Sequence, residues 1–428
     1  MKKNTEESYA LQLDNQDPLI QFKERFVIDD PDLIYLDGNS LGRLPKDTVP
    51  HLQDLVENQW GKGLIEGWNE SWFEMPTRLG SKIAKLIGAQ ADEVVVCDTT
   101  SVNLFKLAAA ALRYQTGRKV LVSDEFNFPT DLYAFQGVID ILGGEHRLDL
   151  IQSKDSISIS EDSVNSAITN DTALVALTQV AFKSAFMYDI QQVTDLAHQK
   201  GALVLWDLCH SVGAVLLELN QWGVDLAVGC TYKYLNGGPG SPAFLYVRKD
   251  LQDLLLPPIW GWFADQDPFA FNLEFIPADG ISRYQISTPH ILSMAGIEPA
   301  LDILMDAGME KLREKSIQQT EYLIYLAQEW LLPLGFQLGS PLDSTKRGSH
   351  ISLRHPEAYR ICRALINPLP GDSNLRVIPD FRAPDNIRLG IAPLYTTFDD
   401  IHRALNRIRS ILENGLFQKY SKEQQKVT

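Results

Sequence analysis

The sequence has few cysteines, no long apolar run and no excess of positive charge, and each absence excludes a class of protein. Its 428 residues include only four cysteines, which are scattered and lack CxxC spacing, so neither a disulfide framework nor a zinc site is expected. No apolar run approaches the roughly 20 residues that span a bilayer. The formal net charge of −16 argues against nucleic acid or an anionic membrane as the main partner.

Several common catalytic and nucleotide-binding motifs are also missing. The chain contains no HExxH and no GxSxG; GKGLIEG is not a GxGxxG fingerprint, and NGGPGS lacks the GK[ST] of a P-loop. The first residues, MKKNTEESYALQLD, contain two lysines but no apolar stretch typical of a secretory signal. With 45% hydrophobic and 22% charged residues, the composition is typical of a globular enzyme, which we expect to be cytoplasmic.

Short apolar runs alternate with helical patterns from about residue 46 onward. The runs include EVVVCD, KVLVSD, ALVALTQV, ALVLWD, LAVGC and AFLYV, and helical patterns such as TRLGSKIAKLIGA and NLFKLAAAAL lie between them. Strands that alternate with helices favour a mostly parallel sheet with helices on both faces. The sequence therefore predicts an α/β fold.

The pattern changes after Pro289. Long amphipathic helical patterns (ILSMAGIEPALDILMDAG and KLREKSIQQTEYLIYLAQEWLLPLG) lead to short strand-like pieces such as HISLRH and NIRLGIA. This mixture is typical of a smaller α+β domain. We therefore predict an N-terminal segment (1–45) near the active site, a large domain (46–290) and a small C-terminal domain (291–428).

Asp207 and Lys233 carry the strongest functional signal. The apolar run GALVLWD ends at Asp207, and DLAVGCTYKY reaches Lys233 just before the glycine-rich NGGPGSP. The carboxyl ends of parallel strands face the crevice where open α/β sheets bind ligands. The interval between the two residues leaves room for a helix at 210–223 and one further strand. Pyridoxal phosphate needs a lysine for its Schiff base and an acid beside its pyridine nitrogen, so we predict that Lys233 and Asp207 bind this cofactor.

The segment CDTTSVNLFKLAAAAL is a candidate phosphate site. It places Thr99, Thr100 and Ser101 between a predicted strand and a predicted helix, where backbone amides and hydroxyls bind phosphate. Ordinary capping of the helix by threonine or serine is the alternative.

Two further positions could contact the cofactor ring. In SDEFNFPTDLYAF, Phe128 could stack on the ring and Asp131 could bond its hydroxyl, although FPTD alone is also a proline turn with a helix cap. Cys209 lies two residues beyond Asp207, on the same strand face, and either lies against the ring or belongs to the core.

Segments along almost the whole chain carry a family resemblance: YLDGNSLGRLP, WNESWFEMPTRLGSKIAKLIGA, NFPTDLYAFQG, WDLCHSVGAV, WGVDLAVGCTYKYLNGGPG, GWFA, ISTPHILSMAGIEPALD and IRLGIAPLYTTFDD. In these segments the chain resembles the kynureninases, fold-type I pyridoxal phosphate enzymes of the aminotransferase class V superfamily. The resemblance implies hydrolysis of L-kynurenine, or of 3-hydroxykynurenine, by Cβ–Cγ cleavage. The products would be anthranilate, or 3-hydroxyanthranilate, and L-alanine.

The resemblance also implies roles for individual residues. Lys233 would be the Schiff-base lysine, Asp207 the partner of the pyridine nitrogen, and Tyr232 either a proton relay or a phosphate ligand. Arg388, in IRLG, would pair bidentately with the substrate carboxylate. The other cofactor-binding positions would be Thr100, Ser101, Phe128, Asp131, Thr178 and His210.

Four more positions also match the family pattern. Trp262 and Thr288 are similar to residues that reach the phosphate from a second subunit, which implies a homodimer. Ser40 and Trp68 match positions near the aromatic end of the substrate.

The chain departs from the family pattern after GWF. There the family usually has Gly followed by His, whereas this chain has Ala264 and Asp265. An aspartate would either add negative charge near the substrate ring or point elsewhere, which leaves open the preferred ring substituent. Thr288 stands where members that favour the 3-hydroxy substrate carry Asn and, with Trp68, favours unsubstituted kynurenine.

Other functions stay open on the sequence alone. A cysteine desulfurase or selenocysteine lyase needs a mobile cysteine in the C-terminal part, and the one candidate, Cys362 in AYRICRALI, is expected to face a helix core. An aminotransferase is a further alternative. A non-catalytic relative that binds pyridoxal phosphate would have lost Lys233 or Asp207, and both are present. The pathway served (NAD synthesis, tryptophan breakdown or anthranilate supply) is also open.

Overall fold

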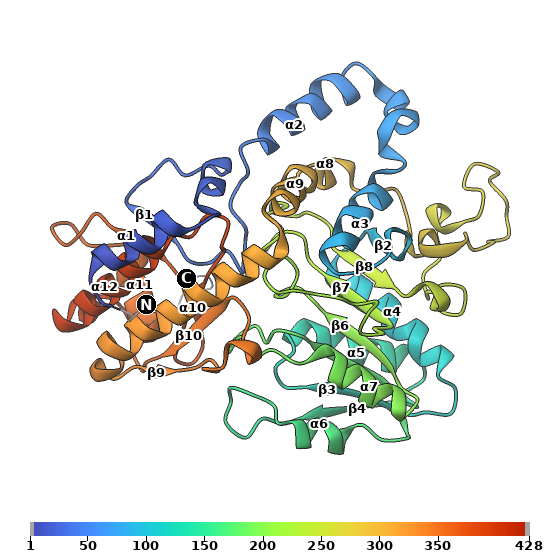
Figure 1. The fold of residues 1–428 in the computed structure, drawn as a ribbon. Helices are drawn as coiled ribbons and strands as arrows, with labels where there is room; N and C mark the ends of the chain where they lie inside the picture. The colour runs from blue at the N-terminus through green and yellow to red at the C-terminus, as the bar shows by residue number, and fades with distance from the viewer. Residues whose placement is uncertain (1–3, 424–428) are drawn as a thin grey trace.

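The larger part of the fold is built on a seven-stranded sheet. We analysed a computed structural model of the chain, which describes residues 4–423 (Figure 1). The strand order is β2-β8-β7-β6-β5-β3-β4, and only β8 runs antiparallel to its neighbours. This confirms the predicted mostly parallel sheet. The strands are β2 (Val94–Val96), β3 (Val120–Asp124), β4 (Arg147–Ile151), β5 (Thr172–Thr178), β6 (Leu203–Asp207), β7 (Leu226–Gly229) and β8 (Phe244–Val247).

The central strands are apolar throughout because helices cover both of their faces. Every residue of β5, β6 and β7 is buried. Alternate side chains enter two different cores: Val204 and Trp206 pack in one, and Leu203 and Leu205 pack in the other. Helices α3 (Met75–Leu86) and α7 (Ile190–Gln199) contribute to the first core, and α4 (Thr100–Tyr114) and α5 (Pro129–Ile141) contribute to the second.

The smaller part contains an antiparallel four-stranded sheet with the order β12-β13-β10-β9. Its strands are β9 (Gln337–Leu338), β10 (His350–Arg354), β12 (Asp380–Arg382) and β13 (Asn386–Gly390), and its helices are α11 (Ala358–Ile366) and α12 (Phe398–Glu413). The long helix α10 (Met309–Trp330) joins the two parts (Figure 1). Leu312 near its start belongs to the large core, and Leu323 and Leu326 belong to the small one. Helix α2 (Thr48–Asp54), α6 (Glu161–Ala167), α8 (Ile291–Ala295) and α9 (Ile297–Ala307) complete the large part.

The N-terminal segment packs largely against the small part. Helix α1 (Glu7–Gln16) lies beside α12, where Asp14 accepts the backbone N–H groups of Phe398 and Asp399 at 2.7 and 2.9 Å (Figure 1). Strand β1 (Leu33–Tyr35) pairs in parallel with β11 (Arg376–Ile378). Ala10, Ile34 and Leu36 thus share a core with the C-terminal elements. The domain boundaries at residues 45 and 290 stay a prediction.

The helix predicted at 210–223 is wrong. This segment forms turns, with Gly213 at φ +80°. Its end is held by another part of the chain, since the N–H groups of Leu219 and Asn220 bond the carbonyls of Ile87 and Gly88. Tertiary hydrogen bonds therefore replace the helical ones here. Strand β7 also ends at Gly229, so Lys233 lies in the turn that follows and not on the strand itself.

Within residues 4–423, no helix is both long and apolar enough to cross a membrane.

Candidate active site

A cavity of about 340 Å³ lies at the carboxyl ends of β5 and β6. Most of the predicted site residues line it, and they come from both parts of the molecule. They are Ser40, Thr100, Ser101, Phe128, Asp131, Thr178, Asp207, His210, Tyr232, Lys233 and Arg388. The cavity is therefore the place where the predicted chemistry converges.

Asp207 and Lys233 are positioned by the sheet and by the turn after β7. Asp207 is the last residue of β6 and is in register with Thr178 of β5. Its carboxylate accepts the N–H of Cys209 at 2.8 Å. The Lys233 amine lies 3.0 Å from Nε2 of His210. An acid and an amine thus face one cavity, as the sequence predicted.

The turn that carries Lys233 is fixed by the N-terminal segment. The N–H of Gly42 donates to the carbonyl of Tyr232 at 2.8 Å. A Cβ atom at Gly42 would collide with the Lys233 carbonyl and with the side chain of Asn236. The glycine in the segment DGNSLG is therefore required by this close approach.

Asp131 is a buried carboxyl beside Asp207. Burial raises the pKa of Asp131 well above its usual value, the charge of Asp207 raises it further, and Lys233 opposes the shift. Its Oδ2 atom is buried and has no hydrogen-bond partner. A protonated carboxyl here can donate a hydrogen bond to a ligand oxygen.

A helix N-terminus forms another wall of the cavity. Helix α4 begins at Thr100, and its N-cap residue Thr99 accepts the N–H of Val102 at 3.4 Å. The first amides of a helix have no partner within the helix and carry partial positive charge, which favours phosphate. The hydroxyls of Thr100 and Ser101 lie at the same edge of the cavity.

A rigid turn presents Phe128. The buried Asp124 accepts the N–H groups of Phe126 and Asn127 at 2.9 and 2.8 Å and the hydroxyl of Tyr188 at 2.5 Å. Phe128 precedes α5, packs edge-on against Phe182 at 5.3 Å, and stays 42% exposed. Its ring is therefore available to stack on a planar ligand.

Arg388 lies at the opposite side, on β13 of the small part. Its side chain is buried, donates to Ser40 Oγ at 2.6 Å and to the carbonyl of Phe182 at 2.7 Å, and pairs with Asp380 at 2.7 Å. Burial lowers its pKa, and the charge of Asp380 opposes the shift. Its Nε atom has no partner. A fixed guanidinium of this kind suits a carboxylate.

Sequence reasoning missed several lining residues: Asn39, Thr130, Phe182 and Arg382. Arg382 is the most important of these, because it adds a second positive charge on the Arg388 side. It lies on β12, a three-residue strand too short for a periodic signal.

Trp68, Trp262 and Thr288 lie outside the cavity of this chain. Trp262 and Trp68 both pack against Phe263, with ring centroids 4.5 and 5.9 Å away. Thr288 lines a separate cavity of about 210 Å³ beside Cys97. One copy of the chain does not bring these three residues to Lys233.

Asp265 is used by its own loop. Its two carboxylate oxygens accept the N–H groups of Asp267 and Ile276, each at 3.0 Å. The carboxylate therefore closes the loop 265–277, and this geometry favours a structural role over a contact with the substrate ring.

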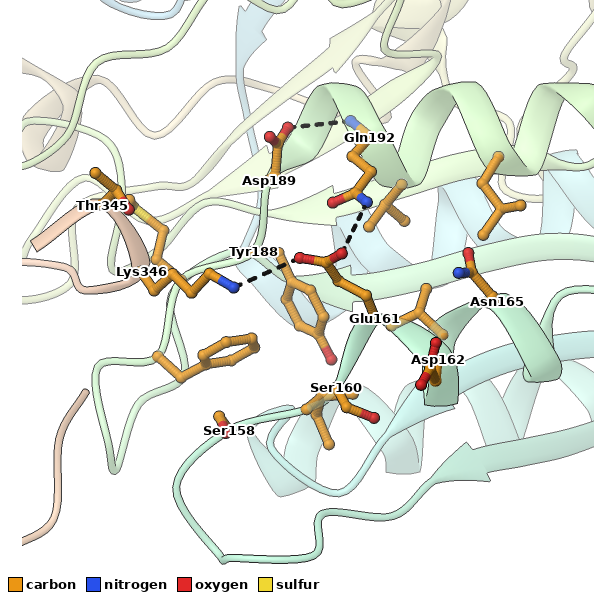
Figure 2. A pocket seen from close by; sticks show the side chains of 16 residues that line it. Ser158, Ser160, Glu161, Asp162, Asn165, Tyr188, Asp189, Gln192, Thr345 and Lys346 are labelled. Carbon is orange, nitrogen blue, oxygen red and sulfur yellow. Dashed lines mark hydrogen bonds and ion pairs between the residues drawn. The ribbon is translucent and has the colours of Figure 1, made fainter. Parts of the chain in front are cut away.

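A more voluminous cavity, of about 510 Å³, contains none of the predicted site residues (Figure 2). It lies between α6, α7 and the turn that carries Thr345 and Lys346. Glu161 extends into it and pairs with Gln192 at 3.3 Å and with Lys346 at 3.5 Å (Figure 2). These polar side chains are exposed and bond one another, whereas those of the smaller cavity are buried and partly unpaired. Volume alone therefore does not identify the site.

Comparison with known proteins agrees with this geometry. The family model for aminotransferase class V matches residues 34–332, and the model for the kynureninase C-terminal domain matches residues 312–408. The chain is 43% identical to the kynureninase of Pseudomonas fluorescens over 409 residues, which cover 94% of this chain and 95% of the relative. The chain belongs to the kynureninase family. The kynureninase of Geobacillus thermodenitrificans is 39% identical over 427 residues and covers 98% of this chain and 97% of its own.

Solved structures show that the fold is shared more widely than the kynureninase sequence. A cysteine desulfurase from Thermococcus onnurineus NA1 matches with a TM-score of 0.76 at 18% identity, covering 89% of this chain and 95% of its own. The cystine C-S lyase C-DES matches with a TM-score of 0.74 at 15% identity, covering 88% and 97%. At such low identity the match concerns the fold alone. Cys362 is fully buried in α11, as predicted, so it cannot act as a mobile desulfurase cysteine.

The residues of the cavity fit the cofactor of the class V family. They offer an amine (Lys233), a buried carboxyl pair (Asp207 and Asp131), an exposed aromatic face (Phe128) and a helix N-terminus (Thr100). The unpaired buried Oδ2 of Asp131 is the atom that most clearly calls for a ligand.

Proposed function

We propose that this protein hydrolyses L-kynurenine to anthranilate and L-alanine, with pyridoxal phosphate held on Lys233. One observation carries the proposal: Lys233, Asp207 and Arg388 converge on one cavity in a chain that is 43% identical to a kynureninase. When bound, pyridoxal phosphate supplies an electron sink for charge that develops at the substrate Cα.

The residues around Lys233 divide the proton transfers. The Lys233 amine takes the proton from the substrate Cα, because it lines the cavity together with Asp207 and lies 3.0 Å from Nε2 of His210. Asp207 pairs with the pyridine nitrogen, and Asp131 donates from its protonated carboxyl. Tyr232 lines the same cavity, and its phenol can give a proton to the substrate Cβ.

The opposite wall holds the substrate. Arg388 binds the α-carboxylate, and Arg382 adds to the positive charge there. Ser40 accepts a hydrogen bond from the guanidinium of Arg388 at 2.6 Å and helps to hold it in place. We propose a preference for unsubstituted kynurenine over 3-hydroxykynurenine, in line with Thr288 and Trp68.

The working unit that we propose is a cytoplasmic homodimer. Trp262 is 40% exposed, and neither it nor Thr288 lines the cavity of its own chain. Both residues are then free to reach the phosphate held by the other subunit.

The experiment that tests this function combines two readouts. The purified protein with pyridoxal phosphate is reduced with borohydride, and mass spectrometry is expected to locate the adduct on Lys233. Anthranilate fluorescence is expected to appear on addition of L-kynurenine, and more slowly with 3-hydroxykynurenine. An adduct on another lysine in the reduced sample, or no anthranilate from the unreduced protein loaded with pyridoxal phosphate, would refute the proposal.

A further inference from the structure

Two buried histidines behind Lys233 have ring nitrogens without partners. His210 donates or accepts through Nε2 at 3.0 Å from the Lys233 amine, but its Nδ1 atom is buried and unpaired. His350, on β10 of the small part, is fully buried; neither ring nitrogen makes a hydrogen bond of normal geometry, and the backbone of Ala181 and Phe182 lies near the ring. The two rings lie 5.5 Å apart between centroids, at an angle of 55°. Buried ring nitrogens without hydrogen bonds need an explanation, and here the two rings are neighbours.

The contact with Lys233 decides which nitrogen of His210 carries the proton. Once Lys233 has taken up a proton, its ammonium group can only donate, so Nε2 of His210 is then the acceptor. The proton of the neutral imidazole then sits on Nδ1, and this N–H needs an acceptor in a buried place. The ring of His350, with its centroid 5.5 Å from that of His210, is near enough to accept through one bridging water.

We propose that His350 is a positioning residue, which accepts from Nδ1–H of His210 and so keeps Nε2 of His210 free to accept from Lys233. Nothing in the family matches assigns a role to His350. The inference rests on the proposed function, since it concerns how Lys233 is held for its proton transfer. Through this contact, His350 of the small part would influence Lys233 in the large part.

The charges around the two rings support neutral imidazoles. Burial lowers the pKa of His350 well below its usual value, and Arg388 and Lys233 lower it further, while the carbonyls of Ala181 and Phe182 oppose the shift. Burial also lowers the pKa of His210, and its neighbours Lys233, Arg388, His350 and Arg382 lower it further.

The carboxylates near Arg388 and Lys233 do not reverse the lowering of the two histidine pKa values. Asp380 and Asp37 lie next to Arg388, at 2.7 and 3.7 Å, and are drawn to its guanidinium. Asp207 and Asp131 lie on the Lys233 side of the cavity. The two histidines therefore sit between cationic groups and act as a neutral hydrogen-bonding pair.

Loss of the acceptor on His350 should change the tautomer of His210 and affect substrate binding less. Without His350, the tautomer of His210 with its proton on Nε2 is no longer disfavoured, and that proton faces the Lys233 amine. An orienting partner that fixes a histidine tautomer matters to the chemical step and much less to ground-state binding. Binding of the substrate carboxylate by Arg388 should be unaffected.

The experiment compares His350→Phe with His350→Gln in the protein loaded with pyridoxal phosphate. Phenylalanine keeps the ring shape and removes the acceptor, whereas the glutamine amide can both accept and donate. We expect His350→Phe to lower kcat about 10- to 100-fold with KM nearly unchanged, and His350→Gln to recover most of the loss. His402→Phe is the matched control, because His402 is also a buried histidine of the small part, bonded to Tyr322 at 3.2 Å.

A second readout does not depend on turnover. The pH midpoint of the absorbance change of the bound cofactor is expected to shift in His350→Phe and to return toward its original value in His350→Gln. Equal losses in the Phe and Gln variants, or a Phe variant with unchanged kcat and an unchanged midpoint, would overturn the proposal. If the unsubstituted protein takes up the cofactor but does not hydrolyse kynurenine, the proposed function fails, while the absorbance comparison still tests His350.

Discussion

Arg388 differs from an arginine that closes a surface salt bridge. Its side chain is 1% exposed, and its donors are directed to Ser40, Asp380 and the carbonyl of Phe182. Exposed ion pairs contribute little to stability, whereas burying a guanidinium carries a desolvation cost that its partners must offset. The role that we propose for this guanidinium is to bind the substrate carboxylate.

Substitution of Arg388 by lysine should weaken substrate binding more than the chemical step. Lysine keeps the charge but loses the planar fork, and a charge-assisted bond of this kind contributes about 1.5–3 kcal/mol, or about 10- to 150-fold. Because the carboxylate is present throughout the reaction, we expect most of this loss in KM for kynurenine. Steady-state kinetics measure it.

Arg354→Lys is the matched control for this substitution. Arg354 lies in the same small sheet and pairs with Asp385 at 3.0 Å near the surface. Its substitution should leave KM unchanged. An unchanged KM in Arg388→Lys would mean that another group binds the carboxylate.

Asp124 should make the stability of the protein depend on pH. Burial raises the pKa of Asp124 to about 6, although its bonds to Tyr188, Asn127 and Phe126 oppose the shift. The unfolded chain ionises near its ordinary value of about 4, so the folded state binds the extra proton between these two pH values. Stability from this group is therefore present below about pH 4, is lost as pH rises to about 6, and is then constant.

Asp124→Asn should remove this dependence. Two units of pKa correspond to about 3 kcal/mol, so the free energy of unfolding of the native protein, relative to the variant, should fall by up to about that amount between pH 4 and 7. Denaturant unfolding at the two pH values measures the difference. Asp155→Asn serves as the control, because Asp155 is an exposed turn residue whose pKa is lowered to about 2 by hydrogen bonds to Ser158 and Ile157 that outweigh its slight burial. If the free energies of unfolding of Asp124→Asn and the native protein differ by the same amount at both pH values, the prediction is contradicted.

Among the structural elements, the loop 265–277 depends most on a single side chain. Asp265 accepts backbone N–H groups at both of its ends, and the loop exposes Phe271 and Leu273 to solvent. Asp265→Ala should therefore open the loop, and Asp265→Asn, which keeps one acceptor oxygen, should open it less. Limited proteolysis within 265–277 should be fastest for the alanine variant.

The same loop bears on substrate choice. Because the Asp265 carboxylate is occupied by backbone groups, Asp265→Asn should change the ratio of kcat/KM for kynurenine and 3-hydroxykynurenine by no more than about 3-fold. A larger change would mean that the carboxylate acts on the substrate ring after all.

For the whole molecule, the separation of Trp262 from the cavity leads to a mixing prediction. Lys233→Ala and Trp262→Ala proteins should each be defective, but a hybrid dimer has one site with both native residues. Random exchange of subunits should then restore about a quarter of the native sites. Anthranilate production after unfolding, mixing and refolding measures the recovery.

Lys233→Ala mixed with Asp207→Asn is the control for that experiment. Both residues line the same cavity of one chain, so no hybrid contains a native site. Recovery in this control, or full activity of a stable monomer, would exclude the proposed sharing of residues between subunits.

The sequence by itself determined the sheet and the identity of its strand-end residues. Runs such as ALVLWD are apolar throughout because both sheet faces are covered, and local hydrophobicity reports this burial directly. Asp207 was identified for the same reason, since a charged residue that ends such a run lies at the carboxyl end of its strand, whereas Lys233 lies in the turn four residues beyond the end of β7. The buried position of Cys362 also followed from its helical pattern.

Only the tertiary structure decided which distant residues meet. The turns at 210–223 exist because Ile87 and Gly88 bond their backbone, and no local pattern encodes that contact. Arg382 reaches the cavity from a short strand, Asp265 bonds a residue eleven positions away, and His350 packs behind His210 from the other part of the molecule. Periodicity reports the burial of each residue, whereas the partner of a buried polar group depends on how the elements pack.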